Sequence, residues 1–243
     1  MKQLQHDSII PLYHQLKEIL KDSVDNGNWN TGDKVPSENQ LMEEYGVSRN
    51  TVKKAIEELV QDGVLYRIQG KGTFVSKPKF QQPLMGFYSF SKVLKEHGMN
   101  PKDIIIDIRE VKPGAKIKEG LQMKNDSNVI ELKRLRCAND EPFILESSFF
   151  TKETVPDMTK LNEVGSISLY DLLDQQFNVV VTRAKEAFEP VLIRGDESKF
   201  LQTKEGLPAL LLERTAFDKE GRPVEFCRSI VRGDRCRFYT ELT

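Results

Sequence analysis

The stretch of residues 35–75 constrains the fold of this 243-residue chain more than any other feature. Ser37 followed by Gln40 is a capping box, which predicts that a helix begins directly after the serine. Gly46 supplies a residue that can adopt a left-handed conformation and end this helix, and Ser48 is a second N-cap residue. The sequence therefore predicts two short helices joined by a tight turn, which need further elements packed against them to be stable.

The second of these helices has an apolar stripe at helical spacing and is followed by a predicted β-hairpin. The stripe consists of Val52, Ala55, Ile56 and Leu59. Residues 64–68 and 73–75 are rich in β-forming side chains and flank the hairpin tip Gln69-Gly70-Lys71-Gly72. Helix, turn, helix and glycine-tipped hairpin form the outline of a winged helix-turn-helix, which is a DNA-reading module.

The side of the second helix opposite the apolar stripe carries hydrogen-bond donors, namely Arg49, Asn50, Lys53 and Lys54. Cations at the start of a helix oppose its dipole, so a helix that only had to fold would place them at its other end. Arginine and asparagine also match the donor and acceptor patterns of guanine and adenine edges. Taken singly, these residues fit a solvated basic face equally well. The turn, the caps and the hairpin together favour DNA binding.

The distribution of charge agrees with a small DNA footprint. The whole chain has a net charge of −1, but residues 1–47 contain four Lys or Arg and eight Asp or Glu. Residues 48–80 contain seven Lys or Arg and three Asp or Glu. Positive charge is thus concentrated on the second helix and the hairpin, which predicts local DNA contact, doubled by dimerisation, rather than a non-specific coat.

Length and composition fit two domains. We predict a DNA-binding domain in residues 1–76, a linker in residues 77–86, where two prolines occur, and a second domain in residues 87–243. No segment has the roughly 18 consecutive apolar residues of a membrane span, and the first ten residues are mostly polar. The three cysteines are widely separated, so we expect a cytoplasmic protein without disulfides, bound metal or cofactor.

The second domain alternates between predicted strands and short helical segments. The predicted strands are residues 103–111, 129–138, 142–150, 179–191, 209–217 and 223–231, and the helical segments are 91–97, 168–175 and 196–202. This pattern predicts an α+β domain around a mainly antiparallel sheet. Arg134 and Arg214 each precede a turn and a strand that begins with proline, which is a faint internal echo.

Several charged residues lie among apolar neighbours in these strands. Arg134 and Arg136 share a strand face with aliphatic side chains, and Glu146 and Glu225 also have apolar neighbours. Buried charges need partners, so these four residues either pair with one another or bind a ligand.

Ser91 and Ser168 lie near predicted helix starts, where hydroxyl and free N–H groups suit an anion such as phosphate. The alternative is that both serines are plain helix caps and that the charged residues lie on the surface of an edge strand. The residues alone leave these two interpretations open.

The first 76 residues resemble the DNA-binding domain of GntR-family bacterial transcription regulators. The matching segments are Pro11-Leu12-Tyr13, Gly32-Asp33-Lys34-Val35-Pro36-Ser37-Glu38, Ser48-Arg49-x-Thr51-Val52 and Gly70-Lys71-Gly72-Thr73-Phe74-Val75. The resemblance implies DNA contacts from Asn39, Arg49, Asn50, Thr51, Lys53, Gly70 and Lys71. Asn39 stands where many members have arginine, and Lys53 replaces a frequent arginine, which forfeits bidentate geometry.

Residues 87–243 resemble the UTRA effector-binding domain of HutC-type GntR regulators, which has a chorismate-lyase-like fold. The matching segments are Ser89-Phe90-Ser91, Arg134-x-Arg136-x-Ala138-Asn139-Asp140, Leu145-Glu146-Ser147-Ser148, Ser168-Leu169-Tyr170, and Glu225 with Arg232-Gly233-Asp234-Arg235. By resemblance to members that sense amino-sugar phosphates, an anion would be held by Phe90, Ser91, Arg134, Arg136, Ser168 and Tyr170. Glu146 and Glu225 would hold the polar body of the effector. Val231 replaces a frequent tyrosine, which suggests a different sugar or a different acid.

These features predict a homodimeric repressor of a catabolic or uptake operon, released from double-stranded operator DNA by a small anionic effector such as a sugar phosphate. The dimer would present two recognition helices to palindromic half-sites about 34 Å apart. One alternative is an enzyme that acts on a small acid, with Glu146 as general acid or base. Against it, the sequence shows no nucleophile–base pair, metal set or cofactor loop. Another alternative is a DNA-bound interaction module without a ligand, its charged residues paired.

Overall fold

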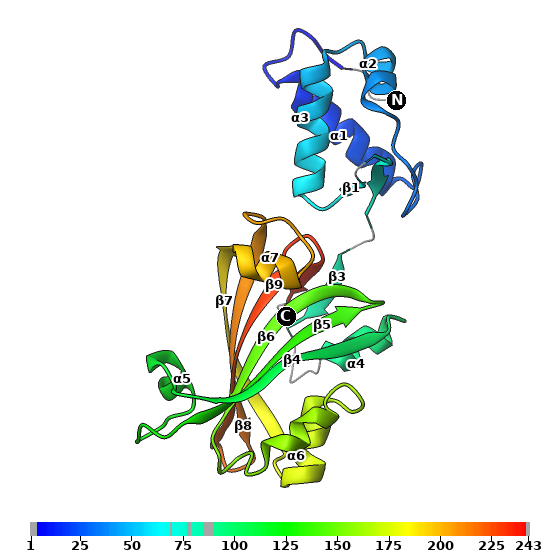
Figure 1. Ribbon diagram of the computed structural model, residues 1–243. Coiled ribbons are helices and arrows are strands. Elements are labelled where there is room, and N and C mark those ends of the chain that lie inside the picture. Colours follow the sequence, from blue (N-terminus) through cyan, green and yellow to red (C-terminus); the bar gives the residue numbers. More distant parts are fainter. Residues whose placement is uncertain (1–3, 69, 77–78, 85–89, 242–243) are drawn as a thin grey trace. The chain divides into compact units, whose positions relative to one another are not determined.

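The chain divides into two compact units, with the boundary between residues 80 and 81 (Figure 1). The computed structural model describes residues 4–68, 70–76, 79–84 and 90–241. Gln69 of the predicted hairpin tip and Ser89 of the predicted anion-binding segment therefore lie outside the described residues.

The first unit is a winged helix-turn-helix, as predicted. It consists of α1 (Leu12–Asp25), α2 (Glu38–Tyr45), α3 (Arg49–Gln61), and the hairpin of β1 (Leu65–Ile68) and β2 (Gly72–Val75). The strands are antiparallel, and their tip forms the wing. α1 packs against α3, so the first helix completes the core that the two shorter helices cannot form alone.

The local signals in the sequence account for the boundaries of these helices. Ser37 and Gln40 form both hydrogen bonds of the capping box at the start of α2. Gly46 ends α2 with a φ of +64°, which is the left-handed region. The side chain of Ser48 accepts a hydrogen bond from the backbone N–H of Thr51 at 3.2 Å and begins α3. The buried residues behind these helices are Leu16, Leu20, Val35, Leu41, Val47, Val52, Ala55, Ile56, Leu59, Leu65 and Val75.

The second unit is built on a six-stranded sheet in which every neighbouring pair is antiparallel. The strand order is β4-β5-β6-β9-β8-β7. The strands are β4 (Pro101–Val111), β5 (Val129–Ala138), β6 (Glu141–Phe150), β7 (Val181–Leu192), β8 (Pro208–Asp218) and β9 (Pro223–Arg232). The predicted α+β domain with a mainly antiparallel sheet is confirmed.

The two faces of the sheet are covered differently. On one face, which we call the helix-covered face, lie α4 (Phe90–Glu96), the 3-10 helix η1 (Met158–Glu163) and α6 (Leu169–Phe177). Of the helices that the described residues form, the other face, which we call the open face, carries α5 (Ala115–Gly120) and α7 (Gly195–Phe200), near opposite ends of the sheet (Figure 1).

Strand alternation decides which side chains each face receives. Arg134, Arg136 and Glu146 point to the helix-covered face, because Arg136 contacts Ser91 of α4 and both arginines contact Glu146 on the same side of the sheet. Lys133 and Ser147 alternate with them and line the open face.

Part of the segment that we predicted to be a linker is a strand. β3 (Phe80–Pro83) lies within residues 77–86 and pairs with β10 (Cys236–Tyr239), another strand that we did not predict. Phe80 and Gln82 are only 3% and 1% exposed. Two buried positions among glutamines and a proline are too weak a pattern to indicate a strand, because the pairing partner lies over 150 residues away in sequence.

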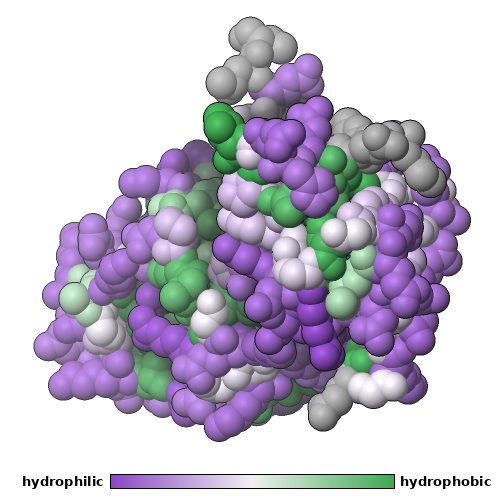
Figure 2. Space-filling model, turned by 90° about the horizontal axis from the view of Figure 1, so that it is seen from above, coloured by the Kyte–Doolittle hydropathy of each residue, from purple (hydrophilic) through white to green (hydrophobic). Residues whose placement is uncertain are grey.

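The surface of the molecule carries both polar and apolar residues. Figure 2 shows one face on which hydrophilic residues predominate and hydrophobic residues form small patches between them. Among the described residues, no helix combines the length and the apolar character needed to cross a membrane.

Candidate DNA-binding surface and candidate effector site

The residues predicted to contact DNA lie on the surface of the first unit. Arg49 and Asn50 are the first two residues of α3, and Lys53 follows one turn later. Asn39 is the second residue of α2. All four are exposed, so their polar groups are accessible to an incoming duplex.

Thr51 is the exception among the predicted contacts, because its hydroxyl has a structural role. Its Oγ1 lies 2.9 Å from the Oγ of Ser48, while its backbone N–H donates to the same serine oxygen. Thr51 thus belongs to the cap that sets where α3 begins.

The wing tip depends on glycine. Gly70 has a φ of +74° and Gly72 a φ of +128°, which side chains rarely adopt. A Cβ at Gly72 would lie 2.7 Å from Cε of Lys34, whereas a Cβ at Gly70 would meet no described atom within 4 Å. The tip is therefore open on the side of Gly70 and the exposed Lys71, and a nucleic-acid backbone could approach it there.

The cations on this surface are joined by carboxylates into what we call the surface charge network, consisting of Glu38, Arg49, Lys53, Glu57 and Arg67. Glu38 lies 3.6 Å from Nε of Arg49 and 3.5 Å from Nη2 of Arg67. Glu57 lies 3.9 Å from Nζ of Lys53 and 4.0 Å from Nη1 of Arg67. Arg67 is a member that we did not predict, because it lies on β1 and the predicted wing contacts lie at the tip of the hairpin.

Lys54 does not belong to this network. We placed it with Arg49 and Lys53 on the side of α3 opposite the apolar stripe. Its Nζ instead lies 3.7 Å from the ring centroid of Tyr13, so it packs against the first helix as a cation–π pair.

The predicted effector residues meet on the helix-covered face of the second unit. Arg134 donates from Nη2 to Glu146 and from Nη1 to Asp103 at 2.9 Å. Arg136 donates from Nε to Asp103 at 3.2 Å and from Nη1 to Glu146 at 3.3 Å. The two arginines and the two carboxylates thus form a closed set of ion pairs on neighbouring strands.

Helix α4 completes this part of the site. Ser91 accepts a hydrogen bond from Nη2 of Arg136 at 3.2 Å, and the Arg136 guanidinium lies 4.9 Å from the ring centroid of Phe90. Ser229 of β9 donates to Glu146 at 3.0 Å. Every one of these groups is positioned by a neighbour, which is the arrangement that a buried charge requires.

A second chain of polar contacts runs beside the first. The hydroxyl of Tyr170, on α6, donates to Glu225 at 2.8 Å and accepts from Nη1 of Arg214 at 3.3 Å. Arg214 donates from Nε to Glu186 at 2.6 Å. Ser168 caps α6: its Oγ accepts from the backbone N–H of Asp171 and donates to the carboxylate of that residue. Arg214 and Glu186 face each other across β8 and β7.

Seven of the eight predicted effector residues line a single small cavity. They are Phe90, Arg134, Arg136, Glu146, Ser168, Tyr170 and Glu225, and Leu169, Arg214 and Cys227 complete the lining. The eighth, Ser91, contacts Arg136 directly. The cavity has a volume of about 20 Å³, which is room for about one water molecule. A sugar-sized ligand can enter only if these side chains move.

The charges of the cluster stabilise one another. Burial opposes ionisation of Glu146, but the positive charges of Arg136 and Arg134 outweigh it and lower the pKa of Glu146 to about 2. Burial likewise disfavours the charged form of Arg136, yet Glu146 and Asp103 raise its pKa above the ordinary value. Burial and the charge of Glu225 raise the pKa of Tyr170, so its hydroxyl stays protonated and can donate.

Four members of this cluster are not among the predicted effector residues, namely Asp103, Glu186, Arg214 and Ser229. Arg214 had a recognisable signal, because it lies among apolar residues of β8 as Arg134 does on β5. Asp103 begins an isoleucine-rich strand and looks like a terminal polar residue. Its role depends on pairing with β5, where it lies opposite Arg136.

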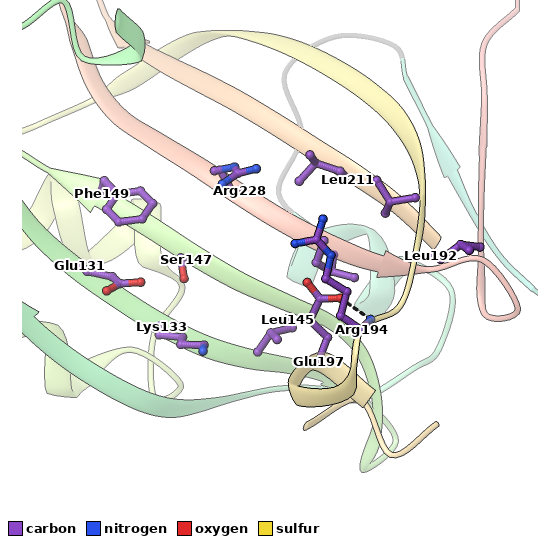
Figure 3. A pocket seen from close by; sticks show the side chains of 12 residues that line it. Glu131, Lys133, Leu145, Ser147, Phe149, Leu192, Arg194, Glu197, Leu211 and Arg228 are labelled. Atoms are coloured by element: carbon purple, nitrogen blue, oxygen red, sulfur yellow. Dashed lines mark hydrogen bonds between the residues drawn. The ribbon is translucent and has the colours of Figure 1, made fainter. Parts of the chain in front are cut away.

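A larger cavity, of about 340 Å³, lies on the open face. Its lining combines apolar side chains of the sheet with charged groups of both signs. Figure 3 shows Arg194 and Glu197 beside each other at one end, with Glu131 and Phe149 toward the other. Lys133 and Arg228 also line it. No group of three or more histidine, cysteine or acidic side chains among the described residues is arranged to hold a metal ion.

Comparison with known proteins assigns both units. Residues 12–75 match the family model described as bacterial regulatory proteins, gntR family, and residues 96–237 match the model of the UTRA domain. This chain belongs to the GntR family of bacterial regulatory proteins. Both resemblances found in the sequence are thereby confirmed, and a GntR-family chain of this kind is a transcription regulator rather than an enzyme.

Individual proteins of this family are similar to the chain over nearly its whole length. The HTH-type transcriptional repressor NagR of Bacillus subtilis (strain 168) is 35% identical over 235 residues, which cover 97% of this chain and 96% of that protein. The "Probable fructoselysine utilization operon transcriptional repressor" of Escherichia coli (strain K12) is 32% identical over 222 residues, 90% of each chain. The crystal structure of PhnF from Mycobacterium smegmatis matches with a TM-score of 0.64 and 26% identity, covering 96% of this GntR-family chain and 99% of PhnF.

Proposed function

We propose that this GntR-family regulator is a cytoplasmic, homodimeric repressor of a catabolic or uptake operon, and that a small anionic effector such as a sugar phosphate releases it from its operator. The DNA contacts would come from Asn39, Arg49, Asn50, Thr51, Lys53, Gly70 and Lys71. The effector would bind at the cavity between α4, α6 and the sheet.

One observation carries the proposal for the effector. Residues from α4, β5, β6, α6 and β9, chosen from the sequence and its family resemblance, converge on one cavity, and seven of its ten lining residues are charged or hydroxylated. Such a cluster inside a domain is costly to bury, so it favours a binding role over a purely structural one.

The charge balance of the cluster narrows the chemistry of the ligand. Its described members include three cations, Arg134, Arg136 and Arg214, and four carboxylates, Asp103, Glu146, Glu186 and Glu225. An anion that takes over the arginines displaces carboxylates, which then need new donors. A sugar phosphate supplies both, because its phosphate accepts hydrogen bonds and its hydroxyls donate them.

The names of the relatives agree with a ligand of this class. The relative from Escherichia coli is named for fructoselysine, a sugar derivative, and both relatives are named as repressors. We carry this to the present chain as part of the proposal: a sugar-derived, anionic compound in the effector site and repression as the sign of control.

Release would begin at α4. A ligand anion at Arg136 competes with the hydrogen bond from Arg136 to Ser91, and α4 follows the linker segment in sequence. A change in α4 would thus reach the DNA-binding unit through residues 77–86. A coupling free energy of about 1–3 kcal/mol between the two sites would suffice for a useful switch.

A thermal-shift experiment tests the effector site. Glucosamine 6-phosphate, glucose 6-phosphate and inorganic phosphate are added to the wild type, to Arg136→Gln and to the control Arg109→Gln. Arg109 lies on β4 of the same domain, but its side chain is 57% exposed and is paired with Glu131, which does not line the effector cavity. A ligand at about 100 times its Kd stabilises the folded state by about 2.7 kcal/mol. That should raise the Tm of the wild type and the control by several degrees and leave Arg136→Gln unshifted. An equal shift in all three proteins would show that the anion binds elsewhere.

The open face supports the proposed dimer. Its lining combines apolar residues with two carboxylates, Glu131 and Glu197, and three cations, Lys133, Arg194 and Arg228. A two-fold copy can therefore place opposite charges against each other around an apolar centre. Ser147→Arg, at the middle of this face, should yield a monomer in analytical ultracentrifugation, whereas Ser127→Arg in an exposed loop should remain dimeric. A dimeric Ser147→Arg protein would place the interface elsewhere.

A further inference from the structure

We propose that Glu38 and Glu57 are specificity-determining residues of the DNA-binding surface. Their carboxylates occupy the cations of the surface charge network and so weaken binding to DNA of arbitrary sequence more than binding to the operator. The proposal rests on the DNA-binding surface proposed above, concerns only the first unit, and does not depend on the identity of the effector.

The positions of the two carboxylates carry the argument. Glu38 begins α2. It lies close to Arg49, the first residue of the proposed recognition helix α3, and also to Arg67 on the wing strand β1. Glu57 lies two turns into α3 and contacts Lys53 and the same Arg67. Both acids therefore lie among the side chains that an incoming duplex must meet, although acidic residues repel phosphate.

These ion pairs contribute little to folding. Their N–O distances of 3.5–4.0 Å are beyond the range of strong hydrogen bonds, and the side chains of Arg49 and Lys53 are 73% and 57% exposed. Exposed pairs of this kind add about 0–1 kcal/mol to stability. Their location on the DNA-binding surface, rather than their strength, needs an explanation.

The effect on DNA binding follows from the source of each kind of affinity. Binding to arbitrary sequence comes essentially from phosphate neutralisation, and the two carboxylates cancel most of the charge of Arg49, Lys53 and Arg67. In the operator complex Arg49 meets a base edge rather than a phosphate, so removing the carboxylates adds less to the phosphate term there than on DNA of arbitrary sequence. Glu38 also lies close to both Arg49 and Arg67 of β1, so its charge attracts the Arg49 guanidinium toward the wing before it meets a base.

The test compares two adjacent glutamates on one helix. Glu57→Gln removes a carboxylate of the network. Glu58→Gln removes the neighbouring carboxylate, which lies 3.3 Å from Lys17 of α1 and outside the network. Lys17 keeps a partner in that control, because it also lies 2.9 Å from Asp62. Binding is measured to two probes: a duplex selected by the wild type from a random-sequence library, and a scrambled duplex of the same composition.

We expect Glu57→Gln to bind the scrambled duplex about threefold more tightly or better, with a slope of log affinity against log salt that is steeper by about one. Affinity for the selected duplex should rise less, so the specificity ratio falls. Glu38→Gln should change both quantities in the same direction, with a larger fall in the ratio. Glu58→Gln should leave both near the wild-type values.

Two results would overturn the proposal. If Glu57→Gln and Glu58→Gln raise affinity for the scrambled duplex equally, only net charge matters and the network has no special role. If the specificity ratio of Glu57→Gln and Glu38→Gln equals that of the wild type, the carboxylates do not discriminate between sequences. Thermal unfolding curves that coincide with the wild type verify that the variants are folded.

Discussion

The two charged clusters of this regulator are built in opposite ways. On the DNA-binding unit, five charged residues meet at distances of 3.5–4.0 Å, and their side chains are 30–73% exposed. In the UTRA domain, the side chains of Arg134, Arg136, Asp103 and Glu146 are at most 11% exposed, and most of their contacts are true hydrogen bonds. The first cluster is loose and exposed, and the second is tight and buried.

This difference determines how easily the ion pairs of each cluster can be replaced by pairs with DNA or with a ligand. A phosphate can replace a surface carboxylate at little cost, because water already screens the pair. A ligand can enter the buried cluster only if it satisfies every group that it separates, since an uncompensated buried charge is expensive. Loose pairs therefore suit contact with many DNA sequences in turn, and tight pairs suit selection of one small molecule.

The largest expected effect tests whether the buried cluster is as tight as its geometry indicates. Glu146→Ala leaves Arg134 and Arg136 without one of their two carboxylates and should lower the free energy of unfolding by about 3–5 kcal/mol. Glu110→Ala is the control, because Glu110 forms an exposed pair with Lys152, and it should lose far less stability than Glu146→Ala. Urea denaturation measures both. Equal losses in the two variants would remove the contrast between buried and exposed pairs.

A pH titration sharpens the same contrast. The pKa of Glu146 is about 2 in the folded protein against an ordinary value of 4.5, so its ionisation favours the folded state. This contribution is fully present above the ordinary value and is lost as the pH falls from about 4.5 toward 2. The stability difference between wild type and Glu146→Gln should shrink over that interval. A difference that stays constant down to pH 2 would mean that Glu146 is not held ionised by the arginines.

On the DNA side, the first effect to measure is that of Arg49→Ala. Loss of a bidentate base contact costs about 1–3 kcal/mol, so affinity for the selected duplex should fall by about tenfold or more. Thermal stability should be unchanged, because the Arg49 side chain is 73% exposed. A wild-type footprint for this variant would count strongly against α3 as the recognition helix.

The smallest expected effect separates two neighbouring lysines. Lys53→Gln should weaken binding to all sequences uniformly and reduce the salt slope by about one, as loss of a phosphate contact does. Lys54→Gln should leave DNA binding unchanged, because Lys54 packs on the ring of Tyr13. Fluorescence anisotropy at several salt concentrations compares them. Equal losses for the two lysines would extend the DNA-binding surface around α3.

Local signals explain why so much of the first unit could be predicted. The starts of α2 and α3 follow from Ser37 and Ser48, because a cap acts on backbone groups only two or three residues away. The tight tip of the wing could be predicted from Gly70 and Gly72, because positive φ angles are a local property of glycine. The strand β3 escaped prediction because it is held by β10, whose position depends on the whole fold.

The effector cluster shows the same limit. Arg134, Arg136, Glu146 and Glu225 stood out because a charge in an apolar strand is conspicuous in any sequence. Asp103 did not, because its importance arises from the register that sets β4 beside β5. Which carboxylate meets which arginine is a property of strand pairing, and residues 31 positions apart give no local sign of it.

The pairing of β3 with β10 has a consequence for how the protein can be altered. The segment that leaves the DNA-reading unit is fastened to the last strand of the chain, and the backbone N–H of Leu84 also donates to the carbonyl of Tyr239 at 2.8 Å. A chain that ends before Cys236 would lack β10, so β3 would lose the strand with which it pairs. A truncation that is remote in sequence from both proposed binding sites would then weaken the proposed coupling between them.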